Sequence, residues 1–139
     1  MVKIVYDIAA MKFMHIFESL THARLKDCIP GPNQIIFVVH ENEIAKAIGR
    51  GGVNVRKLEN KLNKRVKIVE FNADRSRFIQ NLIAPLEIIG MEIKDDDRVV
   101  LTAKDLKTRG LLIGRDASNL RSFEAIIKRY FPIKELRVK

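Results

Sequence analysis

The stretch Ile48–Arg56 reads I-G-R-G-G-V-N-V-R and places three glycines between two segments of helical apolar spacing. Apolar residues recur at i and i+4 over residues 43–48, and at i, i+3 and i+7 over residues 55–62. The pattern therefore predicts two short helices joined by the loop Gly49–Gly52. The first amides of the second helix have no intrahelical partners and carry the positive end of its dipole, so the loop is a predicted anion site.

The same pattern occurs a second time. Ile113–Arg121 reads I-G-R-D-A-S-N-L-R and aligns with Ile48–Arg56 at an offset of 65 residues, with five identities in nine positions. An offset of this size is too long for a solenoid repeat and suits two small domains in tandem. We expect a first domain over residues 1–72 and a second over residues 73–139.

Charge is the most informative bulk property of the chain. The 139 residues are 47% hydrophobic and 31% charged, which is typical of a folded chain rather than a disordered one. The formal net charge is +9 and the pI is about 9.9. This balance favours a polyanionic partner.

Several classes of protein are disfavoured by the same sequence. A single cysteine, Cys28, excludes a disulfide framework, and no apolar run reaches the roughly 18 residues that a membrane-spanning helix needs. The N-terminus has no signal-peptide layout, because charged residues interrupt its apolar positions. We expect a cytoplasmic protein without a membrane partner. The sequence leaves the oligomeric state open and favours a monomer.

Chemistry beyond binding is also not expected. The loop is neither G-x-x-x-x-G-K-[ST] nor G-x-G-x-x-G, and Asn54 stands where the latter would need its third glycine. The three histidines share no metal-ligand spacing, and no Ser-His-Asp or Cys-His set stands out. We predict a protein that is not an enzyme, with no catalytic residue, cofactor or metal.

The two halves have the same predicted order of elements. In the first we expect a helix over 6–24, a short extended piece at 28–29, a strand over 34–40, helices over 43–48 and 53–63, and a strand over 65–71. In the second we expect a helix over 75–83, strands over 86–93 and 98–102, helices over 104–113 and 118–130, and a strand over 133–138. The fold class is therefore α+β.

An isoleucine followed by G-x-x-G between two short helices, with a strand beyond, resembles the KH domain. The resemblance implies a small three-stranded sheet packed on helices, and binding of single-stranded RNA with about four bases in a groove beside the loop. After the second loop only one helix and one strand can fit, so the layout is similar to the type II, prokaryotic KH domain.

Essentially the whole chain resembles the tandem KH region of the NusA family. The junction over residues 72–85, the acidic turn at 94–97 and the second I-G-R-x-x-x-N-x-R carry this resemblance. We expect no polymerase-binding or S1 domain, which makes the chain similar to the short archaeal form. The family implies an RNA-binding factor that acts on nascent RNA in transcription termination or antitermination, with RNA polymerase as a protein partner.

The predicted RNA-binding residues follow from the loops and their charged surroundings. Gly51 and Gly52 would let phosphates approach the amides of Gly52, Val53 and Asn54, while Arg50 would add a charge-assisted contact. Ile48 would help form an apolar floor for bases, together with Ile44, Val53 and the strand Val66–Val69. The full set is Ile48, Gly49, Arg50, Gly51, Gly52, Val53, Asn54, Arg56, Lys57, Lys67, Gly114, Arg115 and Arg121.

The second loop departs from the pattern, since Asp116 and Ala117 replace two loop positions. A carboxylate there would repel phosphate, although residues 104–139 carry ten Lys or Arg against four Asp or Glu, a net +6. This half would bind RNA through side chains or only orient the first half. Two other functions stay open: a ribosomal or RNA-processing KH protein, and a protein-binding module.

Overall fold

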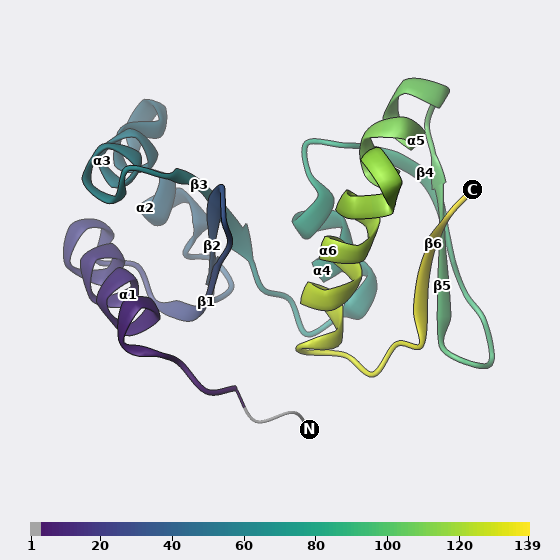
Figure 1. Cartoon of the computed structure of the whole chain (residues 1–139), viewed down its shortest axis with the longest axis horizontal. Coiled ribbons are helices and arrows are strands. Elements are labelled where there is room, and N and C mark those ends of the chain that lie inside the picture. The colour runs from purple at the N-terminus through teal and green to yellow at the C-terminus, as the bar shows by residue number, and fades with distance from the viewer. Residues whose placement is uncertain (1–3) are drawn as a thin grey trace. The chain divides into compact units, whose positions relative to one another are not determined.

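The computed structural model describes residues 4–139, which divide into two compact units, one over residues 5–73 and one over residues 74–139 together with residue 4 (Figure 1). Each contains one three-stranded sheet, and Figure 1 shows helices along one face of each sheet.

The first unit follows the predicted order of elements. Its elements are α1 (Ile8–Thr21), β1 (Leu25–Pro30), β2 (Gln34–Val39), α2 (Ile44–Ile48), the 3₁₀ turn η1 (Arg50–Gly52), α3 (Val53–Leu62) and β3 (Arg65–Glu70). The strand order is β1-β2-β3, with β1 antiparallel to β2 and β3 parallel to β2. The helix pair α2–α3 is therefore the crossover between two parallel strands, and the glycine loop is its midpoint.

The core of this unit lies between the helices and one face of the sheet. Phe17 of α1 stacks on Phe37 of β2 with ring centroids 4.4 Å apart, and both side chains are fully buried. Ala47 and Leu58 bring α2 and α3 into the same cluster. Burial of aromatic and branched apolar groups is the main stabilising term for a unit this small. The core thus holds both helices that flank the loop.

The second unit repeats this arrangement after an additional helix. Its elements are α4 (Arg75–Ile83), β4 (Ile88–Ile93), β5 (Arg98–Ala103), α5 (Leu106–Ile113), η2 (Arg115–Ala117), α6 (Ser118–Lys128) and β6 (Glu135–Val138). Its strand order is β4-β5-β6, again with one antiparallel and one parallel pair. Phe78 of α4 packs edge-on against Tyr130, with centroids 5.2 Å apart. The predicted α+β class and its repeat are confirmed.

The largest differences between predicted and observed element boundaries are at α1 and β1, and each has a physical cause. Asp7 caps α1 by accepting the N–H of Ala10 at 2.7 Å, and His22 adopts a left-handed conformation that ends the helix, so α1 is shorter than the predicted 6–24. Strand β1 is longer than the predicted piece at 28–29. It lies at the edge of its sheet, where Pro30 is tolerated.

Candidate nucleic-acid interface

The first glycine loop has a left-handed backbone at three of its four residues. The φ angles are +77° at Gly49, +62° at Gly51 and +77° at Gly52. A residue that carries a Cβ adopts such a φ angle at a cost of about 1–2 kcal/mol, which glycine avoids. Gly51 is exposed, and a Cβ placed there would meet no atom within 4 Å. The loop therefore presents bare main chain to solvent at its tip.

The second loop has nearly the same backbone without the same glycines. Gly114, Asp116 and Ala117 have φ angles of +73°, +54° and +61°. Two L-residues thus hold the left-handed conformation that the first loop gives to glycine. The loop shape is common to both units, and the chemistry at its tip differs because Asp116 adds an exposed carboxylate.

An asparagine holds each loop between its two helices. The Asn54 side-chain amide donates to the Lys46 carbonyl oxygen at 3.1 Å, and that of Asn119 donates to the Leu111 carbonyl oxygen at 2.8 Å. A Cβ on Gly49 would lie 2.9 Å from the Asn54 amide, and one on Gly114 would lie 2.7 Å from Asn119. The first glycine of each motif is thus required for this close approach as well as for its φ angle. The Asn54 side chain acts as a brace rather than a free ligand donor.

Two of the three amides predicted to receive phosphate are already used within the loop. The Gly52 N–H donates to the Gly49 carbonyl oxygen at 3.1 Å, and the Val53 N–H donates to the Arg50 carbonyl oxygen. The prediction of free amides at Gly52 and Val53 is therefore wrong. The cause is the 3₁₀ turn, whose i to i+3 bonds a sequence motif does not reveal.

The start of α3 nevertheless keeps the electrostatic character of an anion site. Within residues 4–139 no side chain caps this helix N-terminus, and its first turn contains no acidic residue. The positive end of the dipole therefore has no carboxylate against it. The Arg56 guanidinium donates to the Gly51 carbonyl oxygen at 2.7 Å, which braces the loop and holds one cation beside it.

The apolar floor and the strand behind it are only partly as predicted. Ile48 and Val53 are partly exposed beside the loop, while Val66 and Ile68 of β3 pack toward the core under the helices. Alternation along the strand puts Lys67 on the opposite face from Val66 and Ile68. Burial lowers the pKa of Lys67 below its ordinary value. The Lys67 side chain is therefore not grouped with the loop, unlike the other predicted residues of the first unit.

The remaining predicted cations are exposed around the two loops. Arg50 and Lys57 lie at the tip of the first loop and on the outer side of α3. Arg115 and Arg121 occupy the equivalent region of the second unit. Each unit therefore has cations next to an uncapped helix N-terminus, although Asp116 offsets part of the charge in the second.

One repeated contact was missed from the sequence. The Glu59 carboxylate accepts the Val66 N–H at 3.0 Å, and the Glu124 carboxylate accepts the Leu136 N–H at 2.9 Å. These contacts tie α3 to β3 and α6 to β6, and the two glutamates are 65 residues apart. The repeat offset was the signal that could have found them. Their role is to fix each helix against the strand that follows it.

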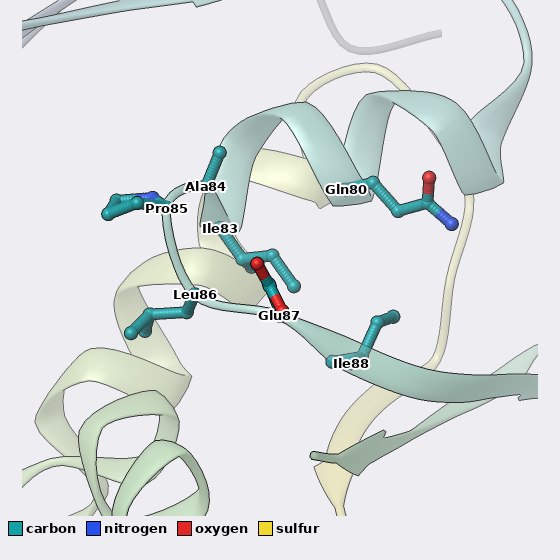
Figure 2. Close-up of a pocket in the computed structure, with 7 residues that line it drawn as sticks. All are labelled: Gln80, Ile83, Ala84, Pro85, Leu86, Glu87 and Ile88. Carbon is teal, nitrogen blue, oxygen red and sulfur yellow. The ribbon is translucent and has the colours of Figure 1, made fainter.

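A hollow of about 500 Å³ lies in the second unit at the junction of α4 and β4, and no residue of the Gly49–Gly52 or Gly114–Ala117 loop lines it. Figure 2 shows Gln80 and Ile83 on the helix above and Ile88 at the start of the strand. Its one charged side chain is Glu87, whose carboxylate lies 3.3 Å from the Lys104 ammonium. A mostly apolar wall with one carboxylate does not suit an RNA backbone, so this hollow is not part of the interface.

Over residues 4–139 no three His, Cys, Asp or Glu side chains gather as a metal site would require. Nor does any helix in that range have the length and apolar character needed to cross a bilayer.

In each unit a helix–loop–helix crossover with a G-x-x-G-type turn packs on a sheet that has one antiparallel and one parallel pair of strands. These features define a protein of two tandem type II KH domains. A sequence profile described as "KH domain" matches residues 14–72. The crystal structure of a protein named APE1850 superposes with a TM-score of 0.78, covering 96% of this chain and 100% of that one, at 24% identity. The predicted tandem KH fold is confirmed.

Relatives named "Probable transcription termination protein NusA" match most of the chain. The one from Methanocaldococcus jannaschii is 32% identical over 124 residues, which is 88% of this chain and 68% of the relative. The one from Halobacterium salinarum is 28% identical over 130 residues, which is 93% of this chain and 94% of the relative. The chain belongs to the NusA family. It is an RNA-binding, NusA-like protein of a non-enzymatic family.

Proposed function

We propose that this protein binds single-stranded nascent RNA and acts in transcription termination or antitermination. The names of its relatives, which refer to transcription termination, support the process. RNA polymerase is the proposed protein partner, because a factor that acts on nascent RNA works where the transcript emerges. We place the cellular site of action in the cytoplasm. The domain limits that we propose are residues 1–72 and 73–139.

The observation that carries this proposal is the tip of the first loop. Gly51 is exposed in a left-handed conformation beside an α3 N-terminus without a cap or an acidic residue. The positive end of the α3 dipole beside an exposed main chain forms an anion site that side chains do not obstruct, although the Gly52 and Val53 amides are used within the loop. A phosphate of single-stranded RNA is the anion that a KH loop of this form suits.

We assign the following roles to the first unit. Arg50 pairs with a phosphate, Arg56 holds the loop and adds positive charge, and Lys57 extends the charged surface along α3. Ile48 and Val53 contact bases with their partly exposed apolar groups. The proposed residues of this unit are Ile48, Gly49, Arg50, Gly51, Gly52, Val53, Asn54, Arg56, Lys57 and Lys67, where Gly49 and Asn54 act by shaping the loop and Lys67 by long-range charge.

The second unit has a smaller proposed role. Gly114 preserves the loop shape, while Arg115 and Arg121 offer cations to the RNA backbone. Asp116 places a like charge beside any phosphate at the tip, which costs about 1 kcal/mol at 4 Å in water and more where water is excluded. RNA that crosses this unit is therefore held by arginine side chains more than by amides.

Two measurements test the proposal. The first is binding of a short oligoribonucleotide at several salt concentrations, for which about four neutralised phosphates predict a slope of log affinity against log salt near −3. A flat line would contradict electrostatic capture and leave a protein-binding module as the explanation. The second is sedimentation of the cell extract on a gradient. Cosedimentation with RNA polymerase is expected, and cosedimentation with ribosomes would favour a ribosomal or RNA-processing role instead.

A further inference from the structure

A second hollow lies in the first unit, between α1 and α3. Its volume is about 340 Å³, within the range of about 300–1,000 Å³ typical of ligand sites. Ile16 and Leu20 of α1 provide apolar surface, and His15, Ser19 and Lys61 provide polar groups. The combination of an apolar surface with donors at its edge suits a base and its phosphate.

The one formal charge among the residues that line this hollow is positive, the ammonium group of Lys61. His15 and Lys61 are exposed, and within residues 4–139 neither forms an ion pair. The two helices contain only two carboxylates, Glu18 and Glu59. Glu18 does not line the hollow, and Glu59 is engaged by the Val66 N–H at 3.0 Å. An anionic occupant is therefore favoured over a cationic one.

A continuous polar face connects the hollow with the glycine loop. The exposed residues of α3 fall within an arc of about 140° at 100° per residue, and they are Arg56, Lys57, Asn60 and Lys61. This face begins beside the loop, where Arg56 donates to Gly51. Lys61 lies eight residues beyond Val53, a rise of about 12 Å. About three to four stacked nucleotides at roughly 3.4 Å each cover that distance.

We propose that the hollow between α1 and α3 is a second site for single-stranded RNA, which takes a nucleotide of the same strand after it leaves the loop. The base lies on Ile16 and Leu20, and the backbone phosphate pairs with Lys61 and accepts a hydrogen bond from the His15 ring. This inference rests on the proposed RNA binding at the loop and extends its footprint along α3. Because the loop groove takes about four nucleotides, the second site is reached only by longer strands.

The test compares oligoribonucleotides of about four and about ten nucleotides, the longer ones extended at either the 5′ or the 3′ end. Ser19→Phe fills the hollow without a change of charge, and Ser19→Ala is its matched control. Lys61→Gln removes the ammonium group, and Lys12→Gln makes the same charge change at an exposed position of α1 that does not line the hollow. Thermal unfolding of each variant verifies that it folds.

We expect Lys61→Gln to weaken binding of one of the longer oligonucleotides about 5-fold at 0.1 M salt, the effect of one phosphate contact. Ser19→Phe should weaken binding of the same oligonucleotide by a similar factor of about 5, because a nucleotide that is kept out of the hollow also loses its contact with Lys61. All variants should bind the four-nucleotide RNA as the unaltered protein does. The two control variants, Ser19→Ala and Lys12→Gln, should also bind the longer oligonucleotides unchanged. Equal losses for Lys12→Gln and Lys61→Gln, or undiminished binding of long RNA to Ser19→Phe and Lys61→Gln, would overturn the second site alone. If the unaltered protein binds neither length, the proposed function fails as well.

Discussion

The double substitution Arg50→Asp and Gly51→Asp should abolish most RNA binding while the protein stays folded. The backbone can accept this change, because Asp116 already occupies the equivalent of Gly51 at φ 54° and ψ 34°, against 62° and 22° for the glycine. No atom lies within 4 Å of the new Cβ. The left-handed conformation then costs about 1 kcal/mol, which lowers the midpoint of thermal unfolding by about 4–8 °C in a domain of this size.

The effect on RNA affinity should be much larger. Each lost phosphate contact lowers affinity about 5-fold at 0.1 M salt, so two lost contacts give about 25-fold before any repulsion from the new carboxylates. Fluorescence anisotropy with a labelled short oligoribonucleotide measures this loss, and circular dichroism measures the unfolding midpoint.

The matched control is Arg115→Asp, beside the resident Asp116. We expect a loss of no more than about 5-fold there, because the carboxylate at its tip already disfavours phosphate. Equal losses in the two units would refute the ranking of the loops. A fall of the unfolding midpoint far beyond 8 °C in the first-loop variant would mean that the loss of binding reflects unfolding instead.

Three further predictions concern stability. Gly49→Ala should lower the free energy of unfolding by about 2–3 kcal/mol, because its Cβ would lie 2.9 Å from Asn54 at a φ of +77°. Gly110→Ala, inside α5, should instead raise the free energy of unfolding by about 0.5–1 kcal/mol, and denaturant unfolding measures both changes. Asn54→Ala should cost about 0.5–1.5 kcal/mol by the loss of its bond to the Lys46 carbonyl, and equal stability of this variant would contradict its role as a brace. Burial, and secondarily the charge of Arg24, lowers the pKa of His40 in the folded protein. The unfolded chain therefore binds this proton more readily, so the free energy of unfolding should fall as the pH drops below about 6.5. Between about pH 7.5 and 5.5, the midpoint of thermal unfolding should fall less in His40→Gln than in the unaltered protein.

The sequence was sufficient for the elements and their order, because apolar spacing, turn residues and caps all agreed locally. Asp74 illustrates this: it directly precedes the helix predicted over 75–83, and it caps that helix by accepting the Ser76 N–H at 2.9 Å. The offset of 65 residues predicted a repeated unit, and the repeat extends to the asparagine braces and the glutamates that hold β3 and β6. Local and repeated signals were therefore reliable guides to the fold.

Details of the site depended on geometry that no local pattern encodes. The motif predicted a helix N-terminus but not the 3₁₀ turn that uses the Gly52 and Val53 amides. The charge of Lys67 suggested a place beside the loop, whereas the alternation of β3 puts its side chain on the face opposite Val66 and Ile68, which pack toward the core. The hollow between α1 and α3 joins residues more than 40 positions apart, which only a folded chain brings together.

The central claim is that the main chain around Gly51, at the start of α3, receives an RNA phosphate. The most direct measurement is the change in backbone amide resonances of ¹⁵N-labelled protein when a four-nucleotide RNA is added. The largest shifts should fall on residues 50–54, with smaller ones on residues 115–119. Unchanged amides at residues 50–54, in a protein that still binds the RNA, would contradict the account.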